Sequence, residues 1–474
     1  MSGNAVERDY GSFRDPSGYV FYYDNNVFRT VDNETLSLIG QLNGANILRE
    51  LVDKGFLVPT QILSDKDSVY KELESQLPCE HNFLRHERIP VITYPYEWPF
   101  SMLADAAILI LNLQLELIEK GYSLKDASAY NIQFVYHKPV FIDVTSIEKP
   151  ERLDVWNAFG QFCQMFLYPL LLKKYRSFNT KSYYLANING MAIEEVIRIF
   201  GRVGALRPSL LFDIFFQYLV QKVASKEVDR LKRSLAKECS ISESQVLNLK
   251  RLLRKIEKLS KPTKPAGHWI DYVNEHSYSP ASEAEKESYI RNFLSKNSPK
   301  TIVDLGANTG QYSLLAEEYG AKVIAVDSDH DSIDRVYKFA RDKQASILPL
   351  WVDLTNTSPG IGFENRERKG FLERIGGECV FALALIHHLL ITSRIPLVRI
   401  RDFLYGLTEK YLVIEFIERT DAMFQKMLAL RKDIYGDITF QSFVDLFEGK
   451  FQLVEQSQIQ KTQRRLVTFR KKSW

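Results

Sequence analysis

Three carboxylates stand where three consecutive strand-like segments end in the C-terminal half of the chain. Asp304 lies in the run Val-Asp-Leu-Gly-Ala-Asn-Thr-Gly of residues 303–310, Asp327 ends the second segment, and Asp353 ends the third. The two glycines of that run lack the Cβ atoms that would keep a ligand off the turn, and the helix behind it offers free N–H groups. The second carboxylate can accept both hydroxyl hydrogens of a ribose, and the third can accept from an adenine amino group. We therefore expect a nucleotide-like ligand here.

The elements that must position these residues alternate between strand and helix. Buried strands are predicted at residues 301–305, 322–326, 348–353, 379–385 and 411–416, with helical segments between them. Five such strands in order imply a doubly wound, Rossmann-like α/β domain, in which ligands bind at the carboxyl ends of the strands.

This arrangement resembles the class I S-adenosylmethionine-dependent methyltransferases over residues 270–474. The resemblance implies S-adenosylmethionine as the cofactor and places its methyl sulfonium opposite residues 384–388 and 414–416. It also implies a terminal hairpin formed by residues 451–457 and 465–470. The residues it assigns to the cofactor are Asp304, Gly306, Asn308 and Gly310 around the methionine part, Asp327 at the ribose and Asp353 at the adenine.

His387, His388 and Glu415 lie on the segments that would face the methyl group, and they are the catalytic candidates. A hydroxyl acceptor must lose its proton, and a histidine titrates near neutral pH. One histidine could instead cap the following helix. Glu415 could orient the base, hold substrate or make a structural hydrogen bond. No Asn/Asp-Pro-Pro-Tyr motif follows the fourth strand, which favours oxygen over nitrogen as the acceptor.

A second constellation lies in the N-terminal half. Asp126 and Asn131 are five residues apart, and a short hairpin separates them from Asp143. This layout resembles the protein-kinase-like catalytic loop, which implies Asp126 as base and Asn131 and Asp143 as metal ligands if the lobe binds Mg-ATP. No glycine-rich loop and no Val-Ala-Ile-Lys strand precede it. Arg29 is the nearest cation, with Glu50 as a candidate helix partner, and a degenerate binding or scaffolding lobe is the preferred interpretation.

The polar segment 355–368 follows the third predicted strand and carries two glycines and two arginines, Arg366 and Arg368. A plain surface loop would account for it. The arginines would also suit an anionic acceptor beside the crevice.

The composition indicates a folded, multi-domain chain. The 474 residues include 62 Lys and Arg against 59 Asp and Glu, so the charge gives no argument for nucleic acid or an anionic membrane. A local excess of basic residues at 222–264 leaves RNA as a minor alternative. The four scattered cysteines, Cys79, Cys163, Cys239 and Cys379, argue against a disulfide framework. With no secretion signal and no uninterrupted apolar span, a cytoplasmic location is expected.

Three regions are predicted along the chain. Residues 1–100 form a small β-containing lobe, residues 101–262 a mainly helical lobe with the kinase-like hairpin, and residues 265–474 the methyltransferase domain. The N-terminal part is thus α+β, and the C-terminal part is α/β.

Several runs, among them Asp-Pro-Ser-Gly at residues 15–18 and Leu-Ile-His-His at 385–388, resemble across almost the whole chain the bacterial methyltransferases related to nodulation protein NoeA. The resemblance implies methylation of a small molecule, a glycan or a lipid-linked sugar. Two alternatives remain open: a bifunctional kinase-methyltransferase acting on one acceptor, and a non-catalytic adaptor that binds the cofactor as a structural ligand.

Overall fold

The computed structural model describes residues 5–219, 243–261, 279–429 and 438–472, and it divides the chain into two compact units. Unit 1 comprises Met1–Lys261 and Gly360–Lys369, and unit 2 comprises Pro262–Pro359 and Gly370–Trp474. The predicted start of the C-terminal domain at residue 265 lies outside the described residues. Within the predicted range 265–474, residues 360–369 belong to unit 1.

Unit 1 begins with a five-stranded antiparallel sheet in the order β1-β2-β3-β5-β4. The predicted hairpin is present, and its turn residues Asp24 and Asn25 both have positive φ, as a two-residue hairpin turn requires. Phe21, Phe28 and Phe83 are fully buried in the core beneath the sheet. The elements of this part are β1 (Glu7–Arg8), β2 (Val20–Tyr23), β3 (Asn26–Thr30), α1 (Asn33–Gly44), α2 (Ile47–Asp53), β4 (Thr60–Ile62), α3 (Ser68–Gln76) and β5 (Phe83–His86).

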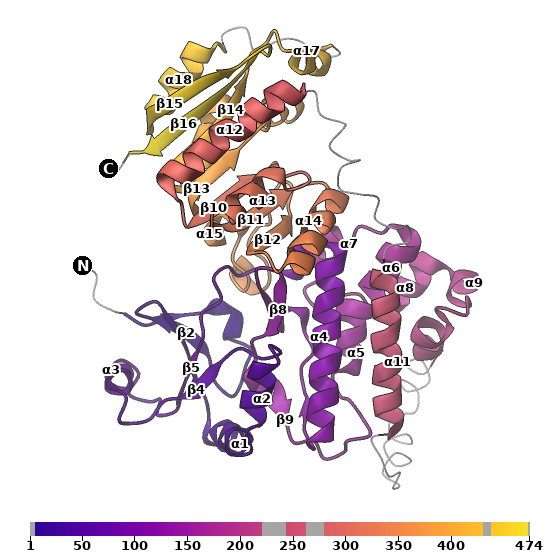
Figure 1. Ribbon diagram of the computed structural model, residues 1–474. Helices are drawn as coiled ribbons and strands as arrows, with labels where there is room; N and C mark the ends of the chain where they lie inside the picture. Colours follow the sequence, from indigo (N-terminus) through magenta and orange to yellow (C-terminus); the bar gives the residue numbers. More distant parts are fainter. Residues whose placement is uncertain (1–4, 220–242, 262–278, 430–437, 473–474) are drawn as a thin grey trace. The chain divides into compact units, whose positions relative to one another are not determined.

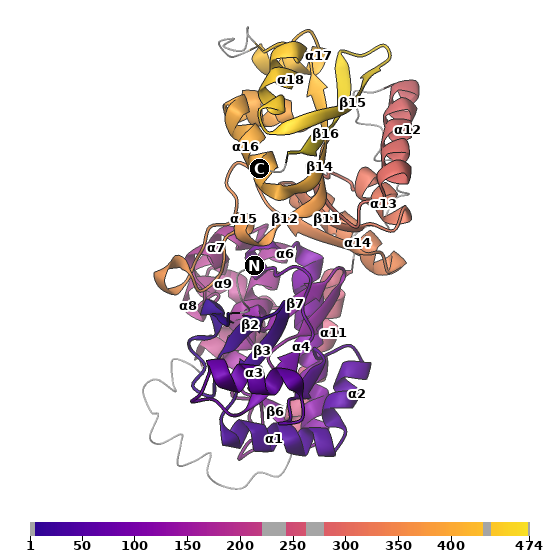
Figure 2. The same ribbon diagram turned by 90° about the vertical axis from the view of Figure 1, so that its left-hand side faces the viewer.

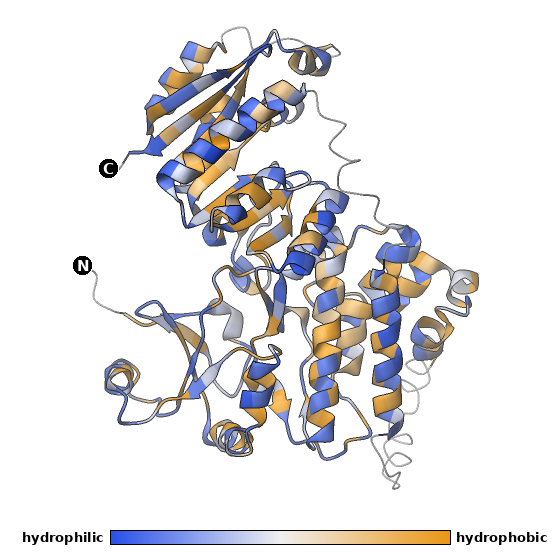
Figure 3. Cartoon of the chain, viewed as in Figure 1, coloured by the Kyte–Doolittle hydropathy of each residue, from blue (hydrophilic) through white to orange (hydrophobic). Residues whose placement is uncertain are grey.

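The rest of unit 1 is mainly helical and is built around α4 (Figure 1). In Figure 3 this helix is largely hydrophobic, whereas α11 beside it alternates between hydrophilic and hydrophobic turns. The helices are α4 (Phe100–Glu119), α5 (Phe159–Phe162), α6 (Tyr168–Arg176), α7 (Thr180–Ala186), α8 (Ile193–Phe200), α9 (Arg202–Ala205) and α11 (Glu243–Ser260). The strands are β6 (Ser123–Leu124), β7 (Ile132–Val135), β8 (Lys138–Phe141) and β9 (Ile147–Glu148).

Helix α4 is long and apolar enough to cross a membrane by length and composition, with a mean hydropathy of 1.6. In the structure 72% of that window is buried inside unit 1. This burial accounts for its apolar composition, because most of the surface of the helix faces the core of unit 1.

Unit 2 contains a seven-stranded sheet in the order β12-β11-β10-β13-β14-β16-β15. The first five strands in that order are parallel, and β16 runs antiparallel to both β14 and β15. The predicted doubly wound α/β fold is therefore confirmed, including the terminal hairpin. The strands are β10 (Thr301–Leu305), β11 (Lys322–Asp327), β12 (Ile347–Trp351), β13 (Gly377–Ala382), β14 (Thr408–Ile417), β15 (Phe451–Ile459) and β16 (Arg464–Lys471).

Helices cover both faces of this sheet (Figure 2). One face carries α12 (Pro280–Asn297), α13 (Gln311–Glu318) and α14 (His330–Lys343), and the other carries α16 (Leu397–Leu407) and α18 (Phe440–Glu448). Two short helices, α15 (Phe371–Arg374) and α17 (Ala422–Leu428), complete the unit. Strands β10 and β13 are neighbours, while β11 lies on the far side of β10, so the strand order reverses at β10. Ligands of open α/β sheets bind at such a reversal.

The segment 360–369 leaves the sheet of unit 2 after β12 and packs within unit 1. Arg14 donates to Glu367 through Nε at 3.0 Å and Nη2 at 3.2 Å, and the Glu367 side chain is almost fully buried. Arg368 donates to the Gly11 carbonyl at 3.3 Å and lies over the Tyr130 ring. The sequence analysis expected Arg368 beside the methyltransferase crevice, but these contacts of its side chain are with residues of unit 1.

Candidate active site

The turn after β10 is shaped by three residues in the left-handed region of the backbone. Gly306, Asn308 and Gly310 have φ values of 74°, 48° and 81°. A Cβ at Gly310 would come within 2.9 Å of Val336, and one at Gly306 would meet Leu385 at 3.4 Å. Backbone conformation and close packing against Leu385 and Val336 thus account for the two glycines.

Asp304 is buried beside this turn. Its side chain accepts a hydrogen bond of 2.6 Å from Ser313 Oγ, the first-turn hydroxyl of α13. Burial raises the pKa of Asp304 to about 6, with the Asp327 carboxylate adding to the shift and Ser313 opposing it. The Lys286 ammonium also lowers this pKa without outweighing burial, and a bound cation would stabilise the carboxylate further. The ammonium and sulfonium groups of S-adenosylmethionine are such cations.

We expect the affinity for S-adenosylmethionine to fall as the pH drops below about 6. The folded-state pKa of Asp304 is raised, so the free site takes up a proton in this range and loses the charge that attracts the ligand. The expected loss approaches tenfold per pH unit between roughly pH 6 and pH 4.5. Isothermal titration calorimetry across this range measures it, and Asp304→Asn should flatten the profile. An unchanged slope in that variant would contradict the assignment.

Asp327 and Asp353 follow the next two strands. Asp327 accepts from the backbone N–H groups of Asn308 and Asp329, each at 2.8 Å, and burial still raises its pKa. The Asn308 contact ties the end of β11 to the turn after β10. Asp353 accepts from Thr355 N at 2.9 Å and from Thr355 Oγ1 at 2.7 Å, which is an Asx turn. The three carboxylates therefore stand along the carboxyl edge of β10, β11 and β12, which are adjacent strands.

His387 and His388 follow β13, and their rings are 4.2 Å apart between centroids. His387 occupies the N-cap position of the helical turn His388–Thr392, yet its side chain makes no capping hydrogen bond. The capping alternative therefore does not apply to His387. The side chain of His387 is buried, and this burial together with the neighbouring His388 lowers the pKa of His387 to about 3. His388 is more exposed, and the part of its ring that is buried lowers its pKa as well. Both imidazoles are neutral at physiological pH, the form that can accept a proton.

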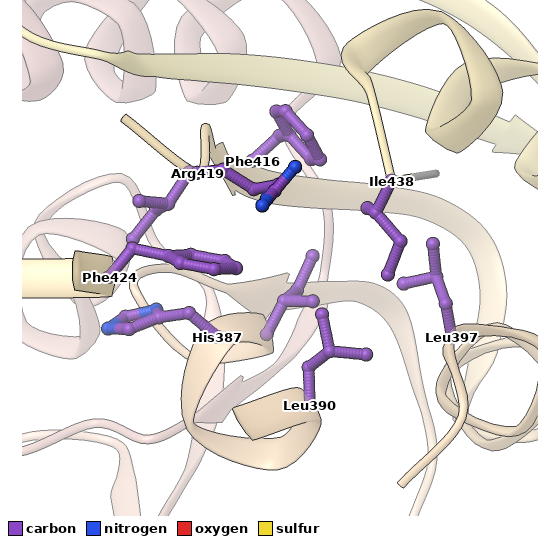
Figure 4. A pocket seen from close by; sticks show the side chains of 9 residues that line it. His387, Leu390, Leu397, Phe416, Arg419, Phe424 and Ile438 are labelled. Atoms are coloured by element: carbon purple, nitrogen blue, oxygen red, sulfur yellow. The ribbon is translucent and has the colours of Figure 1, made fainter. Parts of the chain in front are cut away.

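Glu415 is fully buried in a chain of charged side chains (Figure 4 shows the neighbouring residues of β14 and α17). Its carboxylate lies 2.6 Å from Lys286 Nζ and 3.5 Å from Arg464 Nη1. Arg464 in turn donates to Asp421 through Nε at 2.9 Å. These contacts support the structural alternative for Glu415 rather than contact with substrate. The sequence did not identify Lys286, Arg464 or Asp421.

In the kinase-like group of unit 1, both carboxylate oxygens of Asp143 accept hydrogen bonds. Oδ1 lies 2.5 Å from Arg29 Nη1 and accepts from Thr145 at 2.7 Å, while Oδ2 accepts from Ser146 and, at 3.3 Å, from Asn131 Nδ2. Burial would raise the pKa of Asp143, but Arg29 and the two hydroxyls outweigh it and hold the pKa low. Arg29 also pairs with Asp15.

This arrangement corrects the expected pairing of Arg29 and bears on the conditional metal site. Arg29 pairs with Asp143 and Asp15, not with Glu50, which instead lies 2.6 Å from Lys120 Nζ. The donor set around Asp143 does not fit Mg²⁺, since a guanidinium and two hydroxyls already occupy the oxygens a metal would need. No group of three or more His, Cys, Asp or Glu side chains suited to a metal occurs among the described residues. Asp126 is half-buried, with its pKa raised by burial.

Comparison with known proteins places the chain in a family. No protein-family model matches it. Among solved structures, N-methyltransferase NodS from Bradyrhizobium japonicum WM9 is 13% identical over 41% of this chain and 99% of that chain (TM-score 0.31). The bifunctional kinase-methyltransferase WbdD is 13% identical over 40% of this chain and 38% of that chain (TM-score 0.28). Because these TM-scores are low, the fold of unit 2 is assigned from its strand order alone. Nodulation protein NoeA of Rhizobium meliloti (strain 1021) is 33% identical over 463 residues, 97% of this chain and 95% of that protein, and the chain therefore belongs to the NoeA family.

Proposed function

We propose that the protein is an S-adenosylmethionine-dependent methyltransferase whose active site lies in unit 2. The observation that carries the proposal is the row of Asp304, Asp327 and Asp353 along the carboxyl edge of β10, β11 and β12, beside the left-handed turn of Gly306, Asn308 and Gly310. The strand order of unit 2, with its antiparallel terminal hairpin, is that of the class I methyltransferases. Asp304, Gly306, Asn308 and Gly310 would hold the methionine part, Asp327 the ribose and Asp353 the adenine.

The cofactor, when bound, supplies an electrophilic methyl group on a sulfonium. The protein's part is then to place the acceptor atom in line with the carbon–sulfur bond and to take up the acceptor's proton. For a hydroxyl acceptor, the new carbon–oxygen bond forms as the carbon–sulfur bond breaks, and the released proton passes to a neutral imidazole. His387 and His388 are the candidates for that proton, because both follow β13 and both are neutral at physiological pH.

The proposal is tested by methyl transfer from radiolabelled S-adenosylmethionine to fractions of a host-cell extract. We expect one fraction to become labelled by the wild-type chain. His387→Gln or His388→Gln should lower the rate by about 10²- to 10⁴-fold while leaving cofactor affinity within about twofold, since proton transfer contributes rates of that size. Full activity in both variants would show that neither histidine is the base. Tight cofactor binding without transfer to any fraction would favour the adaptor alternative.

The acceptor class and the location are part of the proposal. We infer an oxygen acceptor on a small molecule, a glycan or a lipid-linked sugar, and a cytoplasmic protein. The bifunctional alternative requires unit 1 to use Mg-ATP, which the Arg29 pairing with Asp143 opposes. We expect unit 1 to act as a scaffold. Mg-ATP consumption abolished by Asp143→Ala would reverse that conclusion.

A further inference from the structure

Residues 360–369, which we call the strap, lie in unit 1, although the chain on both sides of them belongs to unit 2. The base of this excursion is closed in unit 2, where Phe371 N donates to the Ser358 carbonyl at 2.8 Å. Within the strap, Ile361 and Arg368 exchange two backbone hydrogen bonds of 3.1 and 3.0 Å. The strap is therefore a closed loop with paired arms.

The strap is held in unit 1 by a buried carboxylate. The Glu367 side chain is 3% exposed, and it accepts from both Nε and Nη2 of Arg14 and from Phe363 N at 3.0 Å. Next to it, Lys369 N donates to Tyr94 Oη at 3.1 Å. A carboxylate this deeply buried is stable only while its partners are in place, so loss of the Arg14 guanidinium favours release of the strap into water.

Two glycines leave the space that this packing needs. A Cβ at Gly11, on the receiving surface of unit 1, would lie 2.7 Å from Arg368 Nη1. Gly362 in the strap has a φ of 82°, and a Cβ there would lie 2.6 Å from the Glu367 Cβ. The strap and the surface that receives it are thus matched in shape as well as in charge.

The tip of the strap has a strained backbone. Glu364 and Asn365 have φ values of 56° and 59°, in the left-handed region that residues other than glycine disfavour. Strain of this kind persists only where surrounding contacts hold it, and here Glu367 binds Phe363 N just before the tip. Undocking would release the strain, so the strap has a docked and a relaxed arrangement. Coupling between two sites requires an element with two such arrangements.

The strap is joined through a short link to the proposed adenine site. Asp353 follows β12, and only residues 354–359 separate it from the strap. The link is folded from its start, because Asp353 accepts from Thr355 through its side chain and from Asn356 N, at 3.0 Å, through its carbonyl. A short link that is fixed at its far end has fewer conformations available to it. Docking of the strap therefore restricts the positions open to Asp353.

We propose that Arg14 and Glu367 are positioning residues for methyl transfer: by docking the strap in unit 1, they hold the adenine-binding end of β12 in its binding geometry. The inference rests on the proposed function, because it concerns the site of S-adenosylmethionine. It gives unit 1 a task that requires no ATP, which is to preorganise the cofactor site through the strap. By linkage, a bound adenosyl ligand stabilises the docked strap by the same factor as docking strengthens ligand binding.

The first test measures S-adenosylhomocysteine binding to the full chain by calorimetry. Arg14→Met removes both donors to Glu367 and should weaken binding about tenfold, a common size for coupling between distant sites. In methyl transfer this variant should raise the KM for S-adenosylmethionine and leave kcat within about twofold, because adenine contacts are the same before and during the reaction. Arg49→Met is the matched control, since the Arg49 side chain in α2 is 79% exposed, and this variant should bind as the wild type does.

The second test uses hydrogen exchange of the full chain, read by mass spectrometry. Saturating S-adenosylhomocysteine should slow exchange in the strap and in residues 9–14 of unit 1, and Arg14→Met should speed exchange of the strap without ligand. Tyr94→Phe is a milder variant that keeps the ring and removes the acceptor of the Lys369 N–H. It should weaken binding about twofold to fivefold, and it carries the test if Arg14→Met does not fold.

Wild-type affinity in both variants would overturn the inference, as would a loss confined to kcat. Exchange in residues 9–14 that S-adenosylhomocysteine leaves unchanged would overturn it as well. A folded wild-type chain that does not bind S-adenosylhomocysteine would contradict the proposed function itself. Wild-type binding that neither variant alters would remove only the role of the strap.

Discussion

Replacing Glu415 by alanine should destabilise unit 2 by about 3–5 kcal/mol, because it removes the carboxylate that pairs with the buried Lys286 and leaves the buried Arg464 with Asp421. Lys286 and Arg464 are each 4% exposed, and Glu415 is fully buried between them. For a unit of this size each kcal/mol corresponds to roughly 2–4 °C, so the melting temperature should fall by about 10 °C. Differential scanning calorimetry of the full chain measures the shift.

Glu418→Ala is the matched control for this effect. Glu418 lies three residues along the chain and pairs with Arg465 at 3.3 Å, but both side chains are about one-third exposed. Exposed pairs contribute about 0–1 kcal/mol, so this variant should melt within a few degrees of the wild type. If Glu415→Ala melted like Glu418→Ala and lost only activity, Glu415 would be a substrate-contacting residue after all.

Replacing Asp327 by alanine should weaken S-adenosylmethionine binding by about 100-fold or more. The proposed contacts are two hydrogen bonds from ribose hydroxyls to a carboxylate, and hydrogen bonds to charged groups contribute roughly 1.5–3 kcal/mol each. The substitution also removes the acceptor that holds Asn308 N at 2.8 Å and so loosens the glycine turn. Calorimetric titration of the folded variant measures the loss.

Two further variants separate ligand contact from folding. Asp327→Asn keeps an oxygen for the Asn308 N–H and removes the charge, so it should fall between the wild type and the alanine variant in affinity. Burial raises the pKa of Asp327, so losing this charge should not lower the stability of the free protein. Asp342→Ala, at an exposed position of α14, should bind as the wild type does. If Asp327→Ala bound S-adenosylmethionine with wild-type affinity, Asp327 would not be the residue that binds the ribose.

The first three strands of the parallel sheet, β10, β11 and β12, were predictable because each is a short, mainly apolar run that is followed by a glycine turn or ends at or next to a carboxylate. The end of the fourth strand was not. It was predicted at Leu385 and lies at Ala382, because Ala384 adopts a φ of 53° and turns the chain so that Leu385 packs against Gly306. A non-glycine residue in that conformation is set by tertiary packing, which no local pattern reveals.

Ion pairs between residues that are distant in the sequence were the other feature that could not be predicted. Arg29 was recognised as a cation, yet nothing in its own strand indicated Asp143, 114 residues away. Lys286 did leave a signal, since it stands on the same face of α12 as the buried Ser282, Tyr289, Ile290 and Phe293. A lysine on the apolar face of a helix requires a buried anion. The polar composition of residues 360–369 could not predict that they pack within unit 1. Their position depends on contacts of Glu367 and Arg368 with residues 11–14 and 130, which are distant in the sequence.

The most direct test of the account is isothermal titration calorimetry of the full chain with S-adenosylmethionine, S-adenosylhomocysteine and Mg-ATP. We predict one shared site at which the two adenosyl ligands compete, and no heat from Mg-ATP. Mg-ATP binding would show that the Arg29 pairing with Asp143 opens to admit a metal. The absence of binding by both adenosyl ligands to a folded chain would contradict the central claim that the carboxylates of unit 2 form a methyltransferase site.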